Sequence, residues 1–266
     1  MNHNPYECNK IPETSQCKCC GHVSKLAGLV DFSKSCVDAQ VGKKIDPYAG
    51  WPVYFYRCDS CGFTFTRALD HWQKQDFSTY IYNDDYVRHD PDYLGARPQS
   101  NADMIFNSLG GIKDQISLLD YGSGLGLMAD ILEQKGFGSV ANYDPFSSTQ
   151  RPDHQFNMVT CFEVFEHVQD PMALVKDIND FLSVDGALLF STLFCPQQAV
   201  NEGLHNWWYC APRNGHISFY THAALTELAG RFGLHVHNFN DSLHAMFRPE
   251  MVANWLKPLL PPSQTT

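Results

Sequence analysis

The sequence predicts an α/β fold, a mainly parallel sheet flanked by helices, preceded by a small cysteine-rich module. Two observations lead to this prediction. From about residue 97 onward, strand-like and helix-like patterns alternate along the chain. In contrast, seven of the ten cysteines lie within the first 61 residues. We therefore expect a zinc-ribbon-like module at 1–69, a Tyr-rich linker or lid at 70–96, and the α/β domain at 97–266.

Composition narrows the class of protein further. The 19 basic residues are outnumbered by 29 acidic ones, which gives a formal net charge of −10 without a basic cluster. Because nucleic-acid binding needs Lys and Arg along the phosphate path, a nucleic-acid partner is disfavoured. The longest apolar runs are too short to cross a bilayer, and the N-terminus lacks the order of a secretory signal. We expect a cytoplasmic protein without a membrane partner, and its oligomeric state is not predicted.

Two fragments near the N-terminus share the form CxxCG, one from Cys17 to Gly21 and one from Cys58 to Gly62. Tetrahedral zinc binds four thiolates, and each CxxC turn offers two of them on one short loop. The pattern predicts a structural Zn²⁺ site whose ligands are Cys17, Cys20, Cys58 and Cys61. A site with four protein ligands has no open position for a reacting group.

Two alternatives to this ligand set remain. Cys19, Cys36 and His22 are candidate substitutes within it, and the cysteines could also be buried, inert thiols. The segment that follows the module is polar but rich in tyrosine, with Tyr80, Tyr82, Tyr86 and Tyr93 among acidic residues. It is either a lid over a pocket or a partly exposed aromatic connection.

The elements of the α/β domain follow one another in a regular order. We predict a helix over 100–109, a buried strand over 115–121, a glycine turn, a helix over 127–135 and a strand over 139–143. The turn contains Gly122, Gly124 and Gly126. Glycines at such a turn let the chain reverse sharply and let a ligand press against the backbone. The dinucleotide pattern GxGxxG would require glycine at position 127, where Leu127 stands.

Residues 118–126, LLDYGSGLG, resemble motif I of the class I S-adenosylmethionine (SAM)-dependent methyltransferases, hh(D/E)hGxGxG. The resemblance implies a Rossmann-like, seven-stranded class I methyltransferase sheet. It also implies that Asp120 helps to hold the aminoacyl end of SAM. Asp144 ends the next predicted strand 18 residues after Gly126, where an acid would accept hydrogen bonds from both ribose hydroxyls. The cofactor site implied in this way consists of Asp120, Gly122, Ser123, Gly124, Gly126, Asp144 and Glu163.

The resemblance extends over roughly residues 97–248. It covers predicted strands at 156–161 and 187–193, helices at 172–182 and 221–232, and a final antiparallel pair at 234–239 and 242–247. One departure is clear, because only the eleven residues 145–155 separate Asp144 from the next strand. The family usually has a helix, a third strand and an adenine-reading acid there. This segment must be shortened, and Asp153 is its candidate for the adenine contact.

Glu163, Glu166 and His167 form an ExxEH pattern after the 156–161 strand. On a turn or helix start, these positions share one face, and such a set could bind a divalent ion. The pattern resembles that of the metal-dependent ubiquinone-pathway O-methyltransferases and of small-RNA 2′-O-methyltransferases. This resemblance implies Mg²⁺ or Mn²⁺, with His216 as the nearest match to a further ligand. Many enzymes of the class carry a similar pattern without a metal, where it shapes the pocket floor and the helix entry.

The segment after the 187–193 strand is where class I enzymes commonly place acceptor-binding residues. It contains His205, Trp207, Trp208 and Tyr209 as candidate acceptor contacts, and His216 as a candidate general base. In the alternative interpretation, the tryptophans belong to the core and the histidines to the surface. The layout of a CxxC module ahead of a class I domain is similar to that of deoxysugar C-methyltransferases.

These observations predict a SAM-dependent methyltransferase. The enzyme would transfer a methyl group to an oxygen or carbon of a small-molecule acceptor, such as a sugar, a natural product or a quinol. One alternative is a methyltransferase of protein or RNA that uses the zinc module to bind its substrate. A second alternative is a SAM-binding protein without catalytic activity.

Overall fold

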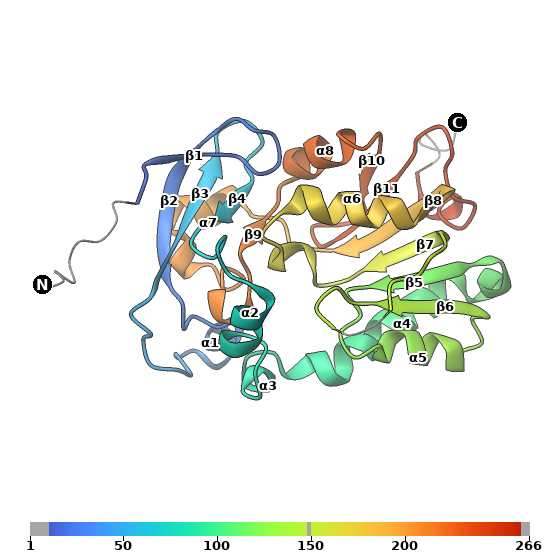
Figure 1. Ribbon diagram of the computed structural model, residues 1–266, viewed down its shortest axis with the longest axis horizontal. Coiled ribbons are helices and arrows are strands. Elements are labelled where there is room, and N and C mark those ends of the chain that lie inside the picture. The colour runs from blue at the N-terminus through green and yellow to red at the C-terminus, as the bar shows by residue number, and fades with distance from the viewer. Residues whose placement is uncertain (1–10, 148–149, 262–266) are drawn as a thin grey trace, which may run out of the picture.

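The computed structural model describes residues 11–147 and 150–261, which form two sheets side by side (Figure 1). The first sheet has the order β1-β2-β3-β4-β9, and all of its pairings are antiparallel. Its strands are β1 (Thr14–Gln16), β2 (Val23–Asp31), β3 (Pro52–Cys58), β4 (Thr64–Thr66) and β9 (Ser218–Phe219).

The second sheet has the order β10-β11-β8-β7-β5-β6. Its strands are β5 (Ser117–Tyr121), β6 (Ser139–Tyr143), β7 (Phe156–Cys161), β8 (Leu182–Ser191), β10 (His235–Asn238) and β11 (Leu243–Phe247). The four strands β6, β5, β7 and β8 run parallel, and β11 and β10 continue the sheet antiparallel. This arrangement confirms the predicted α/β fold with a mainly parallel sheet and a separate N-terminal module.

The number of strands differs from the expected seven. The sheet has six strands, because the described part of the segment between β6 and β7 contains none. The shortening expected for 145–155 is the reason, since the chain passes from the end of β6 to β7 without room for a helix and a further strand. β6 is therefore an edge strand of this sheet.

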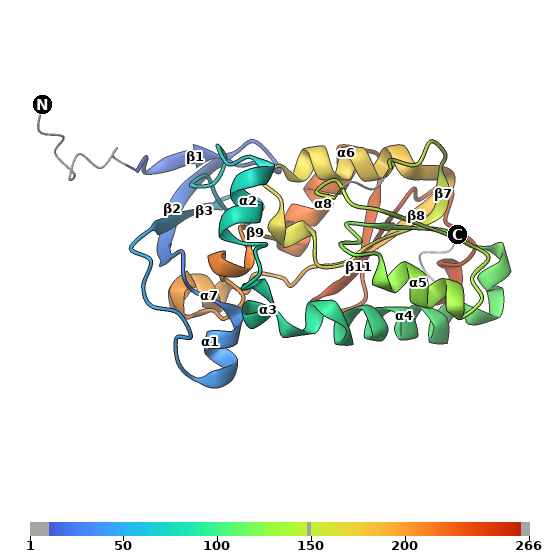
Figure 2. The same ribbon diagram turned by 60° about the horizontal axis from the view of Figure 1, so that its bottom comes forward.

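Helices cover both faces of the second sheet. Figure 2 shows α4 and α5 on one face and α6 and α8 on the other. The helices are α1 (Cys36–Val41), α2 (Lys74–Tyr80), α3 (Tyr86–His89), α4 (Ala96–Leu109), α5 (Leu127–Gln134), α6 (Pro171–Phe181), α7 (Gln197–Asn201) and α8 (His222–Gly230). Three of them, α1, α6 and α8, begin at a residue whose side chain accepts a hydrogen bond from the first turn, and Ser35 is that residue for α1. The Asp170 side chain accepts hydrogen bonds from the first turn of α6, and Thr221 caps α8 in the same way.

The two sheets are joined through the second half of the chain. β9 lies in the α/β half of the sequence but pairs with β4 of the N-terminal sheet. A cluster of buried side chains accordingly combines residues of the N-terminal sheet (Val53, Phe55), of the 70–96 segment, called the lid below (Phe77, Ile81), and of β9 and the segment before it (Leu204, Tyr209, Ile217, Phe219). The boundaries 1–69, 70–96 and 97–266 remain a prediction, and contacts across them are extensive.

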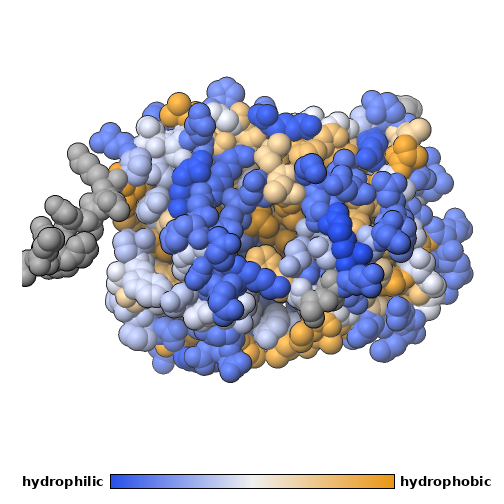
Figure 3. All heavy atoms as spheres, viewed as in Figure 1, coloured by the Kyte–Doolittle hydropathy of each residue, from blue (hydrophilic) through white to orange (hydrophobic). Residues whose placement is uncertain are grey.

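No helix within the described residues is both long and apolar enough to cross a membrane. The carboxyl ends of β5, β6, β7 and β8 point toward the N-terminal sheet (Figure 1). On the face drawn in Figure 3, polar residues cover most of the surface, and apolar residues come to the surface between the two sheets. Ligands of open α/β sheets bind outside the carboxyl ends of the strands, so the N-terminal sheet and the lid border the site that this fold provides.

Candidate active site and cysteine cluster

The four cysteines of the two CxxCG fragments lie together and are buried. Their sulfur atoms are within 4.8 Å of one another, with 3.6 Å between Cys17 and Cys61 and 3.4 Å between Cys20 and Cys58. Four sulfurs around zinc at about 2.3 Å would be about 3.8 Å apart in a tetrahedron. The donor set and its spacing therefore fit a tetrahedral zinc ion, and Zn²⁺ at this site remains our proposal.

The two CxxCG loops have the same backbone hydrogen bonds. Gly21 N–H donates to the Cys17 carbonyl at 3.0 Å, and Gly62 N–H donates to the Cys58 carbonyl at 3.1 Å. Both glycines have positive φ, +80° and +72°, as the tight return of the loop requires. Among the candidate substitutes, Cys19 is buried outside the group of four and His22 is exposed. Cys36 lies elsewhere, with its sulfur 3.8 Å from His216.

The glycine turn connects β5 to α5 at the carboxyl edge of the parallel sheet. Gly122, Gly124 and Gly126 all have positive φ. A Cβ at Gly122 would lie 2.4 Å from Cγ2 of Val164, whereas a Cβ at Gly124 would meet no atom within 4 Å. The turn therefore packs tightly against the 163–167 segment at Gly122, and it leaves open space at Gly124.

Two carboxylates and a hydroxyl surround this turn, from Asp120, Asp144 and Ser123. The Asp144 carboxylate accepts a hydrogen bond from Gly124 N–H at 2.8 Å and one from Phe146 N–H at 2.7 Å. Within the described residues, the buried Ser123 hydroxyl has no hydrogen-bond partner. Asp120 is buried and accepts a hydrogen bond from Thr160 at 3.2 Å. Burial raises the pKa of Asp120 to about 7, and the negative charge of Asp144 adds to the increase.

Glu163 has a backbone conformation that sequence reasoning did not anticipate. Its φ of +56° is in the left-handed region, where a non-glycine residue costs about 1–3 kcal/mol. A pair of hydrogen bonds with Ser191 at the end of β8 holds it there. Glu163 N–H donates to the Ser191 hydroxyl at 2.9 Å, and that hydroxyl donates to the Glu163 carboxylate at 2.8 Å. Glu163 is thus tied to β8 instead of joining a cluster with the rest of the ExxEH pattern.

Glu166, His167 and His216 form that cluster. Each offers one ligand atom, and these atoms lie within 4.8 Å of one another. Glu166 is fully buried, and burial raises its pKa to about 8, with a further contribution from the Glu163 carboxylate. Burial holds the pKa of His167 well below its usual range and lowers that of His216 to about 4. Both imidazoles are therefore neutral near pH 7, which is the form that binds metals and accepts protons.

The lid reaches this cluster through Tyr82. Its hydroxyl lies 3.1 Å from Nδ1 of His167, and its ring contacts that of Phe146, next to the Asp144 carboxylate. Gly215 allows this approach, because a Cβ there would lie 2.9 Å from Nδ1 of His167 and 3.1 Å from the Tyr82 hydroxyl. Tyr82 was singled out in the sequence only as one of four lid tyrosines, and no local pattern distinguishes it from the others.

The remaining acceptor candidates are spread over several environments. Trp208 is 44% exposed, and His205 is also exposed, outside the cluster. Trp207 is half-buried against Phe219, and Tyr209 is buried with its hydroxyl on Glu166. Asp153, the candidate for the adenine contact, is exposed beside His154.

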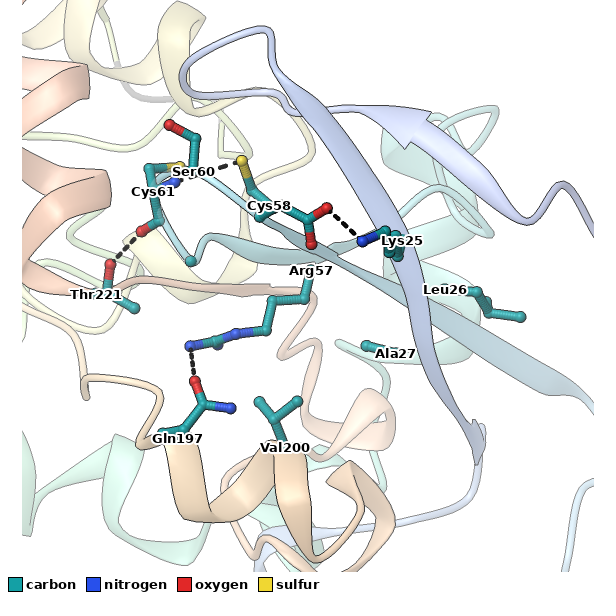
Figure 4. Close-up of a pocket in the computed structure, with 12 residues that line it drawn as sticks. Lys25, Leu26, Ala27, Arg57, Cys58, Ser60, Cys61, Gln197, Val200 and Thr221 are labelled. Carbon is teal, nitrogen blue, oxygen red and sulfur yellow. Dashed lines mark hydrogen bonds and ion pairs between the residues drawn. The ribbon is translucent and has the colours of Figure 1, made fainter.

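A separate cavity of about 570 Å³ lies beside the second cysteine loop, between β2, β3 and α7 (Figure 4). Three of its polar side chains are bonded to other protein groups. Arg57 donates to Gln197 at 3.0 Å, Lys25 pairs with Asp59 at 2.8 Å, and the Thr221 hydroxyl donates to the Cys61 carbonyl. Glu166, His167 and His216 do not line this cavity, so it is distinct from their cluster.

The parallel sheet and its glycine turn have the order that an α/β methyltransferase domain requires. A family model described as a methyltransferase domain matches residues 87–238, and the chain belongs to this family of enzymes. Residues predicted to form the cofactor and acceptor sites lie largely within this matched range.

The chain is also similar to individual proteins. It is 28% identical over 130 residues to a ubiquinone biosynthesis O-methyltransferase of Yersinia enterocolitica, a match that covers 40% of this chain and 50% of the relative. The chain thus spans about half the length of the curated relatives it matches. Among solved structures, it is similar to magnesium protoporphyrin IX methyltransferase of Synechocystis PCC 6803 with bound SAH (TM-score 0.42, 14% identity, 68% of this chain and 97% of that one). It is also similar to Streptomyces venezuelae DesVI (TM-score 0.42, 16% identity, 64% of this chain and 98% of that one).

Proposed function

We propose that this enzyme transfers the methyl group of SAM to a hydroxyl oxygen or an acidic carbon of a small-molecule acceptor, with His216 as the general base. The observation that carries the proposal is the state of the His216 imidazole. Its Nδ1 lies 2.8 Å from the Tyr209 carbonyl, which can only accept a hydrogen bond, so Nδ1 carries the proton. Nε2 of the neutral ring then has a free electron pair for an acceptor proton.

The reaction is an in-line displacement at the methyl carbon. The bond between sulfur and methyl breaks as the bond to the acceptor oxygen or carbon forms, and the sulfur leaves as S-adenosylhomocysteine. The acceptor proton passes to Nε2 of His216. Asp120, Ser123 and Asp144 would hold the aminoacyl and ribose ends of SAM, as their positions around the glycine turn support. Gly122 of the glycine turn packs tightly on Val164, which lies two residues before Glu166. This packing supports a short distance between the SAM site and the cluster of Glu166, His167 and His216.

A metal-assisted alternative, in which His216 would be a metal ligand instead of the general base, is supported by the grouping of Glu166, His167 and His216. Two imidazoles and one carboxylate suit Mn²⁺ better than Mg²⁺, which prefers oxygen ligands. A bound ion would lower the pKa of an acceptor hydroxyl. The named activity of the ubiquinone biosynthesis relatives makes a hydroxylated aromatic ring one acceptor to test.

The test is S-adenosylhomocysteine formation from SAM with catechols, quinols and nucleoside diphosphate sugars, with EDTA and with added Mn²⁺. We expect turnover with one acceptor class. His216→Ala should lower kcat by about 10²–10⁴-fold with little change in SAM affinity, because the loss is that of a general base. His235→Ala, at an exposed position of β10, is the matched control. Chelator-insensitive turnover would reject the metal-assisted form, and SAM binding without turnover on any acceptor would reject catalysis.

A further inference from the structure

Tyr209 was expected to form a wall of the acceptor pocket, but its surroundings indicate another role. It lies between two short 3-10 helices at 204–206 and 212–214, and it is only 4% exposed. Its ring packs on that of His216, with 4.3 Å between centroids. A side chain so buried offers little surface to an acceptor, whereas the neighbouring Trp208 is 44% exposed.

The Tyr209 hydroxyl is directed at Glu166. It donates a hydrogen bond to Oε1 of Glu166 at 2.7 Å and accepts a long one, 3.5 Å, from the Leu193 amide. Because an amide N–H can only donate, its contact is consistent with the hydroxyl proton lying toward Oε1 of Glu166. Within the described residues, Oε2 of Glu166 has no hydrogen-bond partner. Tyr209 therefore fixes one oxygen of this carboxyl group and leaves the other available.

The backbone of the same residue orients His216. The Tyr209 carbonyl accepts from Nδ1 of His216 at 2.8 Å, which sets the tautomer and leaves Nε2 unprotonated in the neutral ring. Two of the three clustered side chains are thus held by one residue, through its hydroxyl and through its carbonyl.

We propose that Tyr209 is a positioning residue, which holds the Glu166 carboxyl group and the His216 imidazole in their working orientation without touching the acceptor. The inference rests on the function proposed above for the same site. Residues that orient reactive or metal-binding side chains without touching the ligand are important for function. Mutating such a residue typically lowers activity or metal affinity by about 10–100-fold.

The test is Tyr209→Phe, which removes the hydroxyl and keeps the ring and the carbonyl. We expect kcat to fall about 10–100-fold with the KM for SAM unchanged. In crystal structures with S-adenosylhomocysteine, the Glu166 carboxyl group should turn away from its wild-type position, and His216 should keep its bond to the backbone. Glu166→Gln, whose amide oxygen can still accept from Tyr209, should keep the wild-type orientation.

Tyr220→Phe is the matched control. Tyr220 is a fully buried tyrosine nearby, but its hydroxyl donates to the backbone carbonyl of Phe165 at 3.0 Å. The Tyr220→Phe variant should lose about as much stability as the Tyr209→Phe variant, but its kcat should stay at the wild-type value. An unmoved Glu166 with wild-type kcat in Tyr209→Phe would overturn the inference. If the wild-type enzyme turns over no acceptor, the proposed function fails, and the crystal structures still decide whether Tyr209 positions Glu166.

Discussion

Gly122 and Gly124 share a turn and a positive φ, +73° and +55°, but their surroundings differ. Any other residue is strained at both positions because of the backbone conformation. Only at Gly122 would a side chain also collide with a neighbour, since its Cβ would lie 2.4 Å from Val164. Substitutions at these two glycines therefore separate the cost of the backbone conformation from the cost of a steric clash.

We expect Gly122→Ala to destabilise the ligand-free protein by about 1–3 kcal/mol more than Gly124→Ala, which is the range for overpacking. The free energy of unfolding in urea measures the difference. Gly124→Ala serves as the control for the φ penalty that both variants share. Equal stabilities would show that Val164 moves aside without cost.

Residues of the donor site were predictable from the sequence because they follow a linear pattern. The glycine turn and Asp144 stand at fixed spacings that reflect local backbone geometry. The left-handed φ of Glu163 and the bond from Tyr209 to Glu166 had no such signal. Both depend on residues far away in the sequence, Ser191 for one and the fold of the 204–216 segment for the other.

At the scale of elements, the 3-10 helix Pro212–Asn214 connects the lid to the segment that carries His216. The buried Asn214 side chain donates to the His89 carbonyl of α3 at 2.8 Å and accepts from Cys36 N–H at 2.9 Å. Next to it, Arg213 donates to the Ile81 carbonyl at the end of α2 at 2.9 Å. The lid is thereby fastened to the loop that precedes the candidate base.

Asn214→Ala should release the lid. Two buried backbone groups lose their partner, at a cost of about 1–3 kcal/mol each. We expect faster amide hydrogen exchange over residues 81–90, with the parallel sheet unchanged. Asn206→Ala is the control, because exposed Asn206 also bonds a backbone carbonyl, that of Glu202 at 2.7 Å. Wild-type exchange of the lid in Asn214→Ala would contradict this role.

The sequence predicted most elements of the parallel sheet within a few residues, because their apolar runs and capping residues are local signals. The largest discrepancy is β8, which begins at Leu182 instead of 187. β9 was not predicted at all. Two residues, Ser218 and Phe219, carry no periodicity, and they form a strand only because β4 lies beside them.

At the scale of the whole molecule, the cysteine cluster is bonded to elements outside the N-terminal sheet as well as to that sheet. The Thr221 hydroxyl donates to the Cys61 carbonyl, and Arg231 after α8 donates to the Cys20 carbonyl at 3.0 Å. Further along, Ile217 N–H donates to the Glu166 carbonyl at 2.8 Å. Loss of the cluster is therefore expected to disturb the segment that carries His216.

We expect about one zinc per chain, lost in Cys58→Ser together with thermal stability and activity, because four-ligand zinc sites contribute directly to folding. Metal analysis and thermal unfolding measure this. Cys19→Ser is the matched control, since Cys19 is an equally buried cysteine outside the group of four. A Cys58→Ser protein as metal-rich and stable as Cys19→Ser would exclude a zinc role for these residues.

The two-residue strand β9 has a consequence for how this protein can change over evolutionary time. It belongs to one sheet, and the chain that follows it leads through α8 to β10 and β11 of the other. A recombination event near residue 96 would bring in a foreign N-terminal half whose edge had never been matched to Ser218 and Phe219. The two halves are therefore expected to be inherited together and to accumulate compensating substitutions along the line where β4 meets β9.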